Sequence, residues 1–272
     1  MDIVTVTCLR DLNDMLRQAE SIEKFVEPCT HWVIVNDNSI DLFKEVLSQY
    51  YSRHFLNLIN FSDYLLNKIN CGYKRQQVLK LRMAKFLKEK YLVLDSKNFF
   101  IKQTNLNEFE NQLGSGLLES VNCDHLFYST VEQYKTILDY TKLDNLHLAI
   151  QTPFVIDPEI LNFNLNLENL LYQFSKINPY MSEFFLYSLM YEKYKRVRIS
   201  EEIEKSSKPI HYTAFEKIKS IENIIQMSYN LNVKVLALHR NYIDAIDNTE
   251  IEIFNKFLIS LGFKNLLKEK NV

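Results

Sequence analysis

Strands and helices alternate along the first hundred residues, and this alternation limits the fold more than any other feature. Short β-branched or apolar runs predict strands, and apolar residues at helical spacing predict the helices between them. The predicted strands are 2–7, 31–35, 55–59 and a run from residue 92, and the predicted helices are 12–25, 42–50 and one that begins at residue 72. Such a series forms a parallel sheet with right-handed crossovers. The sequence therefore predicts an α/β fold with a mostly parallel sheet.

Beyond residue 101 the pattern becomes mixed and richer in helix. We expect strands near 125–128, 149–156 and 233–238, and helices near 131–140, 165–174, 180–194 and 251–261. Neither an internal repeat nor a low-complexity linker divides the chain. We therefore expect a single domain over residues 1–272, in two halves of about 1–101 and 102–272.

The composition excludes several functional classes. The formal net charge of the 272 residues is -2, which shows no electrostatic footprint for nucleic acid. The 4 glycines cannot be arranged into a dinucleotide-binding or P-loop motif, and the 4 cysteines form no Cys-x-x-Cys pair. No apolar run approaches the roughly 18 residues of a membrane span. We expect a cytoplasmic protein without a transmembrane segment.

The run 91–101 is an apolar strand that ends on an acidic turn, Asp95-Ser96-Lys97, and resumes as a second apolar run. A short buried strand that delivers a carboxylate to its carboxyl end places it where open α/β sheets bind ligands. Asp95 is therefore a candidate binding residue. A helix-capping aspartate, or a salt bridge to Lys97, is the alternative interpretation.

Six segments, taken in order, resemble GT-A-type glycosyltransferases, and in particular a bacterial and phage group of them. The segments are 3–7, 35–39, 72–81, the Asp95 turn, 151–154 and 181–187. The resemblance implies a GT-A-like domain with a Rossmann-like nucleotide-sugar-binding half over 1–101 and an acceptor half over 102–272. It also implies transfer of a sugar from a nucleotide diphosphate, with UDP as the expected nucleotide. The expected acceptor is a carbohydrate of surface polysaccharide or lipopolysaccharide synthesis.

The resemblance implies a set of residues that bind the donor. Asp37 and Asn38 would contact the base and ribose, although an Asx turn before the next helix is an equal reading of their chemistry. Residues of the helix from 72 would donate to phosphate or sugar hydroxyls, where the alternative is a solvated basic face. The full set is Thr5, Asp37, Asn38, Arg75, Gln76, Lys80, Asp95, Ser96 and Lys97.

Lys97 departs from the family's Asp-x-Asp segment, whose second acid helps to hold a metal. A protonated lysine is no ligand for Mn²⁺ or Mg²⁺. In the interpretation that we favour, the Lys97 ammonium replaces the metal and neutralises the leaving diphosphate. In another, Asp95 holds a metal with His239, although a lone histidine at a strand end needs no such role. A non-catalytic relative is a third.

Glu183 follows Ser182 at the start of a predicted helix. A carboxylate there could deprotonate the acceptor hydroxyl in an inverting displacement, or it could simply be a favourable charge in the first helical turn. Two rival classes remain: a non-catalytic binding module with this fold, and a nucleotidyltransferase. The latter would need two metal-binding carboxylates, and the sequence shows only Asp95.

Overall fold

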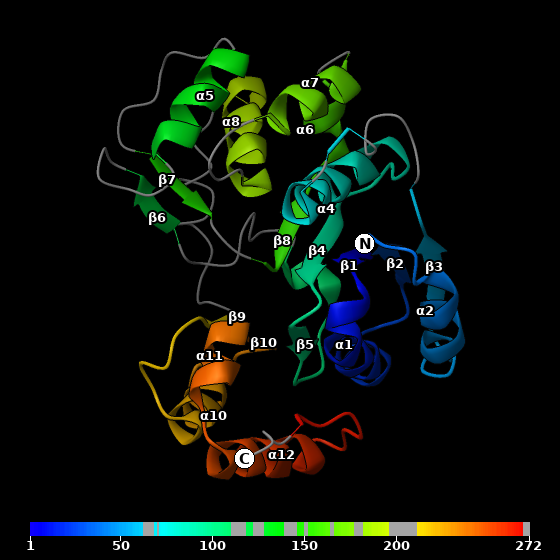
Figure 1. Ribbon diagram of the computed structural model, residues 1–272, viewed down its shortest axis with the longest axis vertical. Coiled ribbons are helices and arrows are strands. Elements are labelled where there is room, and N and C mark those ends of the chain that lie inside the picture. The colour runs from blue at the N-terminus through cyan, green and yellow to red at the C-terminus, as the bar shows by residue number, and fades with distance from the viewer. Residues whose placement is uncertain are drawn as a thin grey trace.

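The computed structural model describes residues 1–61, 68–69, 71–109, 118–121, 128–138, 146–149, 152–163, 166–176, 182–195 and 211–268. Its main sheet has five strands in the order β3-β2-β1-β4-β8 (Figure 1). These strands are β1 (Asp2–Thr7), β2 (Thr30–Val35), β3 (Phe55–Ile59), β4 (Tyr91–Asp95) and β8 (Phe154–Ile156). The first four are parallel, and β8 runs antiparallel to β4. The predicted α/β class with a mostly parallel sheet is confirmed.

The register of the sheet brings several carboxyl ends to one edge. Val6 of β1 pairs with Asp95, the last residue of β4, and Thr7 pairs with Val35, the last residue of β2. The strand order reverses at β1, because β2 and β3 extend the sheet on one side of it and β4 on the other. Ligands of open α/β sheets bind at such a switch point.

Alternate residues of the strands face different helical layers. Val4 and Val6 pack in one core with α4, whereas Ile3 packs with α1 on the opposite face. The helices beside this sheet are α1 (Leu12–Phe25), α2 (Ile40–Leu47) and α4 (Gly72–Arg82), with the 3-10 turns η1 (Leu9–Asp11) and η2 (Met83–Lys85). The hydrophobic residues of the strands therefore hold α1 and α4 on either side of β1.

The rest of the described chain forms a second sheet and a helical layer (Figure 1). The second sheet has the order β5-β10-β9, with β5 (Asn98–Phe100), β9 (His211–Ala214) and β10 (Val235–Leu238), and near it lie η3 (Leu106–Phe109), α10 (Ile221–Asn230), α11 (Arg240–Ala245) and α12 (Asn248–Ser260). The helical layer contains α5 (Tyr128–Leu138), α6 (Pro158–Asn162), α7 (Leu167–Phe174) and α8 (Glu183–Lys195), beside the hairpin of β6 (Leu118–Val121) and β7 (Leu146–Ala149). Each described helix is too short or too polar to cross a bilayer.

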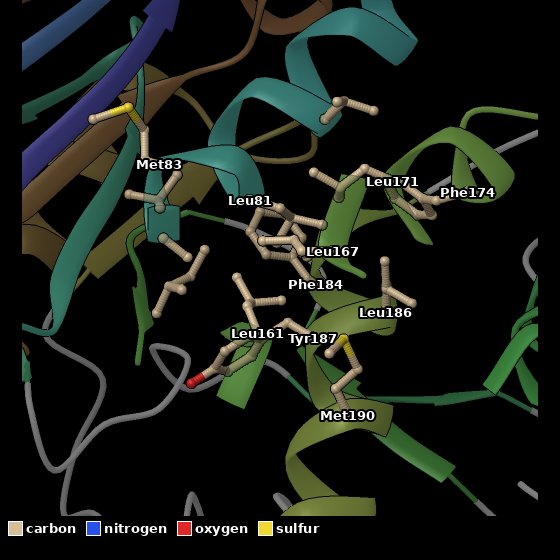
Figure 2. Packing of buried hydrophobic residues seen from close by; sticks show 14 of the residues in the cluster. Leu81, Met83, Leu161, Leu167, Leu171, Phe174, Phe184, Leu186, Tyr187 and Met190 are labelled. Atoms are coloured by element: carbon tan, nitrogen blue, oxygen red, sulfur yellow. The ribbon is translucent and has the colours of Figure 1, made fainter. Parts of the chain in front are cut away.

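Helix α8 is buried on nearly every side, and its packing determines where its first residue, Glu183, lies. Phe184, Leu186 and Tyr187 of α8 lie in one core with Leu81 of α4 and Leu161 of α6, as Figure 2 shows. A fully buried aromatic or leucine side chain contributes roughly 1.5–3 kcal/mol. The packing of α8 on α4 therefore brings the amino end of α8 toward the carboxyl edge of the sheet.

The structure differs from the sequence-based elements in several places. The second helix begins at Ile40, which follows the Asp37–Ser39 turn, and it ends at Leu47, earlier than predicted. The strand predicted at 125–128 lies largely outside the described residues, and its last residue, Tyr128, begins α5. Strands β6 and β9 and helices α6, α10 and α11 were not predicted. The extended segment predicted at 149–156 is divided between the end of β7 and β8.

Two buried histidines predict acid sensitivity. Burial lowers the pKa of His31 to about 3 and that of His211 to about 4. Between these values and the usual pKa near 6.5, the unfolded chain binds protons that the native protein does not. The free energy of unfolding should therefore decrease as the pH falls from 7 to 5, by up to about 1.4 kcal/mol per pH unit for each histidine. Urea titrations at pH 7, 6 and 5 measure this slope, and a flat profile would contradict it.

Candidate active site

A cavity of about 490 Å³ opens at the carboxyl edge of the main sheet. Five segments of the chain supply its walls: the connection from β1 to α1, helix α4, the turn after β4, the start of α8, and the β9 and β10 ends with α11. The lining residues are Arg10, Asp11, Asp14, Tyr73, Gln76, Gln77, Lys80, Asp95, Ser96, Lys97, Ser182, Glu183, Phe184, Phe215, Leu238, His239, Arg240, Asn241, Ile243 and Asp244. The cavity therefore lies at the switch point of the sheet.

A row of alternating charges forms the inner wall of the cavity. Lys97 Nζ lies 2.7 Å from Asp95 Oδ2, and Lys80 Nζ lies 2.7 Å from Asp95 Oδ1. Lys80 Nζ also lies 2.7 Å from Glu183 Oε1. The side chains of Lys80 and Glu183 are 3% and 2% exposed, whereas those of Asp95 and Lys97 are both 22% exposed. The Asp95–Lys97 end of the row is therefore its more accessible part.

Burial and pairing act in opposite directions on Asp95. Burial alone would raise its pKa, but the ammonium groups of Lys80 and Lys97 outweigh burial and hold the pKa well below its usual range. For Lys80 the two carboxylates likewise outweigh burial, and its pKa is raised. Asp95 is an anion and Lys80 a cation at neutral pH.

Glu183 is the buried end of the row. Its pKa is raised, because burial outweighs the attraction of the Lys80 ammonium, and the negative charge of Asp95 raises it further. The amide of Gln77 also donates to this carboxylate when its nitrogen faces it, 2.6 Å from Oε1. A carboxylate with a raised pKa binds a proton more strongly than an ordinary carboxylate, which suits general-base chemistry.

His239 caps α11 and faces the exposed end of the row. Its Nδ1 accepts a hydrogen bond from the backbone nitrogen of Asn241 at 3.2 Å, and its ring lies 5.4 Å from that of Phe215. Burial and the nearby Lys97 ammonium lower the pKa of His239, so the ring is neutral at pH 7. Since Nδ1 is an acceptor, the neutral ring carries its proton on Nε2. Nε2 is therefore a hydrogen-bond donor.

The structure brings seven of the predicted site residues together at the cavity: Gln76, Lys80, Asp95, Ser96, Lys97, Glu183 and His239. Gln76 and Lys80 lie on the helix that begins at residue 72, and Asp95, Ser96 and Lys97 form the turn after β4. Glu183 is the first residue of α8. His239 reaches the cavity because β10 carries it to the same edge. What each residue does there stays a prediction.

The other predicted residues do not line the described cavity. Thr5 is fully buried between Gln18 and His31, because odd-numbered residues of β1 face α1, and its side chain does not line the cavity. Asp37 accepts hydrogen bonds from the backbone nitrogens of Leu9 and Ser39, which matches the Asx-turn alternative. Asn38 belongs to the same turn, and Arg75 lies on α4 beside the lining residue Gln76.

The sequence analysis missed the cavity residues of the β1–α1 connection, Arg10, Asp11 and Asp14, and those near α11, Phe215, Arg240 and Asp244. Arg10, Asp11 and Asp14 follow a predicted central strand directly, which is the signal that could have identified them. Arg240 lies 3.2 Å from Asp11, so the two groups of residues meet across the cavity.

Comparison with solved structures identifies the fold. The chain is similar to the apo structure of the WbbM bifunctional glycosyltransferase, with a TM-score of 0.53 and 12% sequence identity over 96% of this chain. The match covers 49% of that protein, so the chain spans about half its length. The parallel sheet, its switch point and this likeness define a GT-A-type fold.

The chain belongs to the family of unknown function DUF6492, whose model matches residues 1–217. No curated protein matches the sequence. Two further structures are similar at lower scores. Mouse xyloside xylosyltransferase 1 is 9% identical with a TM-score of 0.48, over 87% of this chain and 96% of that one. The galactosyltransferase LgtC, in complex with donor and acceptor sugar analogs, is 14% identical with a TM-score of 0.45, over 97% of both chains.

The residues at the cavity do not fit a divalent metal ion. Both oxygens of Asp95 are engaged by ammonium groups. To ligate through Nε2, His239 would need its proton on Nδ1, where it instead accepts from Asn241. Among the residues that the structure describes, no group of three or more His, Cys, Asp and Glu is arranged to hold a metal. The predicted ligand pair Asp95 and His239 is therefore not prepared for Mn²⁺ or Mg²⁺.

Proposed function

We propose that this protein is a GT-A-type glycosyltransferase that moves a sugar from a nucleotide-diphosphate donor, with UDP as the nucleotide, to a carbohydrate acceptor. The proposed pathway is surface polysaccharide or lipopolysaccharide synthesis, and the proposed compartment is the cytoplasm. The observation that carries the proposal is the Asp95–Lys97 pair, which lies at the switch point of a GT-A-type sheet and at the accessible end of a buried row of charges.

The Lys97 ammonium is proposed to bind the diphosphate. Two ammonium groups flank Asp95, and together they carry the charge of a divalent ion. Lys80 is buried and holds the carboxylate in place, so Lys97 is the one of these two ammonium groups that can reach a phosphate oxygen. The Nε2–H of His239 is a second donor at the same end of the cavity. Together these groups would stabilise the negative charge of the leaving diphosphate.

The charge of the whole cavity gives little attraction to an anion. Among the described lining residues the cations are Arg10, Lys80, Lys97 and Arg240, and the carboxylates are Asp11, Asp14, Asp95, Glu183 and Asp244. Four cations against five carboxylates leave a net charge of −1. Affinity for a nucleotide diphosphate would therefore come from local donors and not from the field of the cavity.

The proposed chemistry is a single displacement at the anomeric carbon. The acceptor hydroxyl oxygen bonds to this carbon, the bond from the carbon to the diphosphate oxygen breaks, and the diphosphate leaves with the electron pair. The hydroxyl proton passes to Glu183, whose raised pKa suits a base. The displacement inverts the configuration at the anomeric carbon.

A panel of nucleoside diphosphates and nucleotide sugars tests the proposal. A ligand that binds only the native state raises its melting temperature by mass action, by an amount that grows with concentration over Kd. We expect UDP or a UDP-sugar to raise Tm at millimolar concentration, with and without EDTA. A panel in which no nucleoside diphosphate raises Tm would reject the donor cavity.

Lys97→Ala should weaken binding of the nucleoside diphosphate about 10- to 150-fold, because a charge-assisted hydrogen bond is worth roughly 1.5–3 kcal/mol. Excess EDTA should leave the affinity of the unmodified protein unchanged. Isothermal titration measures both, and Lys256→Ala is the matched control, since Lys256 is 70% exposed and pairs with Glu252 on the same helix, α12. If binding is lost in EDTA and recovered in Mn²⁺, a bound metal ion and not Lys97 neutralises the diphosphate.

A non-catalytic sugar-nucleotide-binding protein is the second candidate. The observation that favours it is the environment of Glu183, whose oxygens are contacted by Lys80 and Gln77. A carboxylate held in this way has little freedom to take a proton from an acceptor. Donor binding without any transfer or donor hydrolysis would support this candidate.

A further inference from the structure

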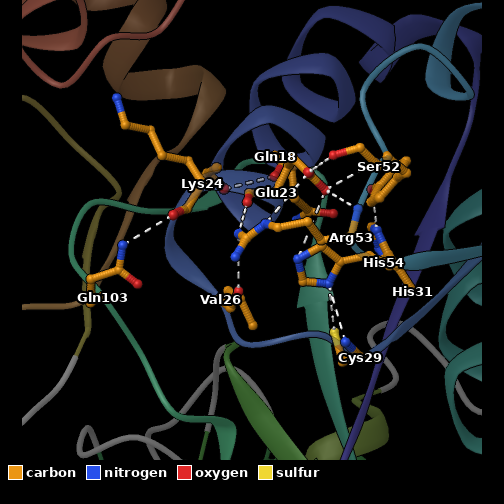
Figure 3. A network of polar contacts seen from close by, with 12 residues as sticks. Gln18, Glu23, Lys24, Val26, Cys29, His31, Ser52, Arg53, His54 and Gln103 are labelled. Carbon is orange, nitrogen blue, oxygen red and sulfur yellow. Dashed lines mark hydrogen bonds and ion pairs between the residues drawn. The ribbon is translucent and has the colours of Figure 1, made fainter.

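A chain of buried hydrogen bonds ends on the turn that carries Lys97. The side-chain nitrogen of Gln18, in α1, donates to the carbonyl oxygens of Asp95 at 2.7 Å and Asn98 at 2.9 Å. Gln18 is fully buried, and Figure 3 shows it on helix α1 within a network of polar contacts. Ser96 and Lys97 form the turn that joins β4 to β5, and Asp95 and Asn98 flank it. The Gln18 amide therefore holds the residues on both sides of this turn.

The direction of every hydrogen bond in this chain follows from the turn. Because the two hydrogens of Gln18 Nε2 go to carbonyls, its Oε1 accepts, and the Thr5 hydroxyl at 2.8 Å must donate to it. Thr5 Oγ1 then accepts from His31 Nε2 at 3.0 Å. The remaining nitrogen of a neutral His31 is an acceptor, and it contacts the hydroxyl of Tyr51. Donors therefore run in one direction, from Tyr51 to the turn.

The reverse orientation of the Gln18 amide is unfavourable. It would place Oε1 against two carbonyl oxygens, and the cost of a buried polar group without a partner is about that of a lost hydrogen bond or more. The two carbonyls therefore fix the orientation of the amide, and Thr5, His31 and Tyr51, each of which can donate or accept, adopt the matching direction. A further hydrogen bond, which is not part of this series, closes the same turn: the backbone nitrogen of Asp95 donates to Asn98 Oδ1 at 2.7 Å.

We infer that Gln18 is a positioning residue of the cavity, and that Thr5, His31 and Tyr51 support it by keeping its Oε1 hydrogen-bonded inside the protein. Gln18 is buried and is not among the lining residues of the cavity; it acts by holding the Asp95–Lys97 turn against α1. Its effect on diphosphate binding rests on the proposed function, whereas its effect on the turn does not. The presence of a histidine and a threonine in the interior, where apolar residues would pack as well, is explained by this role.

The experiment compares three variants in the ligand-free protein and with UDP. Gln18→Met removes both donors at similar volume, Thr5→Val removes the hydroxyl at nearly the same shape, and Thr5→Ser restores it. Lys97 in each is labelled with an amine reagent and quantified by mass spectrometry, with Lys256 as the internal reference. UDP affinity is measured on the same samples, and Tm is recorded for each.

Gln18→Met and Thr5→Val should release the turn, so that Lys97 is labelled faster than in the unmodified protein and UDP binds about tenfold more weakly. Thr5→Ser should match the unmodified protein in both. If Gln18→Met does not fold, Thr5→Val decides alone. Unchanged Lys97 labelling in Gln18→Met and Thr5→Val, whatever the change in Tm, would overturn the inference. If the unmodified protein does not bind UDP, the proposed function fails, and the labelling of Lys97 still decides the role of Gln18.

Discussion

Lys80→Met is expected to lower the free energy of unfolding by about 3–5 kcal/mol at pH 7, because it leaves buried carboxylates without their shared cation. Among the described residues, Lys80 supplies the only ammonium group that contacts Glu183, whose side chain is 2% exposed. Asp95 keeps Lys97, so the larger part of the cost falls on Glu183. Urea or guanidinium titration measures the change.

The pH dependence of this variant identifies the mechanism. Without Lys80, the folded-state pKa of Glu183 rises further above its unfolded value, and the native state binds the proton more tightly. The destabilisation by Lys80→Met should therefore shrink as the pH falls from 7 toward 5. Lys85→Met is the control, since Lys85 pairs with Glu168 on the surface at 39% exposure and should cost under about 1 kcal/mol. Equal losses for the two variants would mean that the buried row of charges does not stabilise the protein.

The first half of the fold was predictable because each element carries its own pattern. The helix at 12–25 and the strands at 2–7 and 55–59 have the same bounds in the structure as in the prediction. Strand β5 was harder: residues 98–100 lie in the first half of the chain but pair with Val235–Ala237 in a separate sheet. A pairing over that distance along the chain leaves no local trace in a single sequence.

The site was predictable in part for the same reason. Asp95 and Lys97 stand in a recognisable strand end, and the structure places them at the cavity. The partnership of Lys80 with Glu183, 103 residues apart, depends on how α8 packs on α4, and no spacing rule reveals it. Thr5 shows the opposite error: its position in a matching segment suggested a ligand contact, but the alternation of β1 turns it toward α1 and Gln18.

Glu183→Gln should reduce sugar transfer about 10²–10⁴-fold while donor affinity is retained, if Glu183 is the base of an inverting displacement. The amide keeps the size of the side chain but cannot take the acceptor's proton. Since burial raises the pKa of Glu183, the acid limb of the pH–rate profile of the unmodified enzyme should lie above the usual carboxyl range, and the variant should lack this limb.

The alternative role of Glu183 gives a different set of results from the same variant. If the carboxylate only balances Lys80 and favours the first turn of α8, the amide should change stability by under about 1 kcal/mol, since Lys80 keeps Asp95 and the buried negative charge is removed. Transfer and its pH profile would then stay as they were. Donor affinity, unfolding free energy and transfer must be measured together, because a fall in transfer with a parallel fall in donor affinity would indicate a displaced Lys80. Unchanged transfer by a folded Glu183→Gln protein would remove Glu183 from the mechanism.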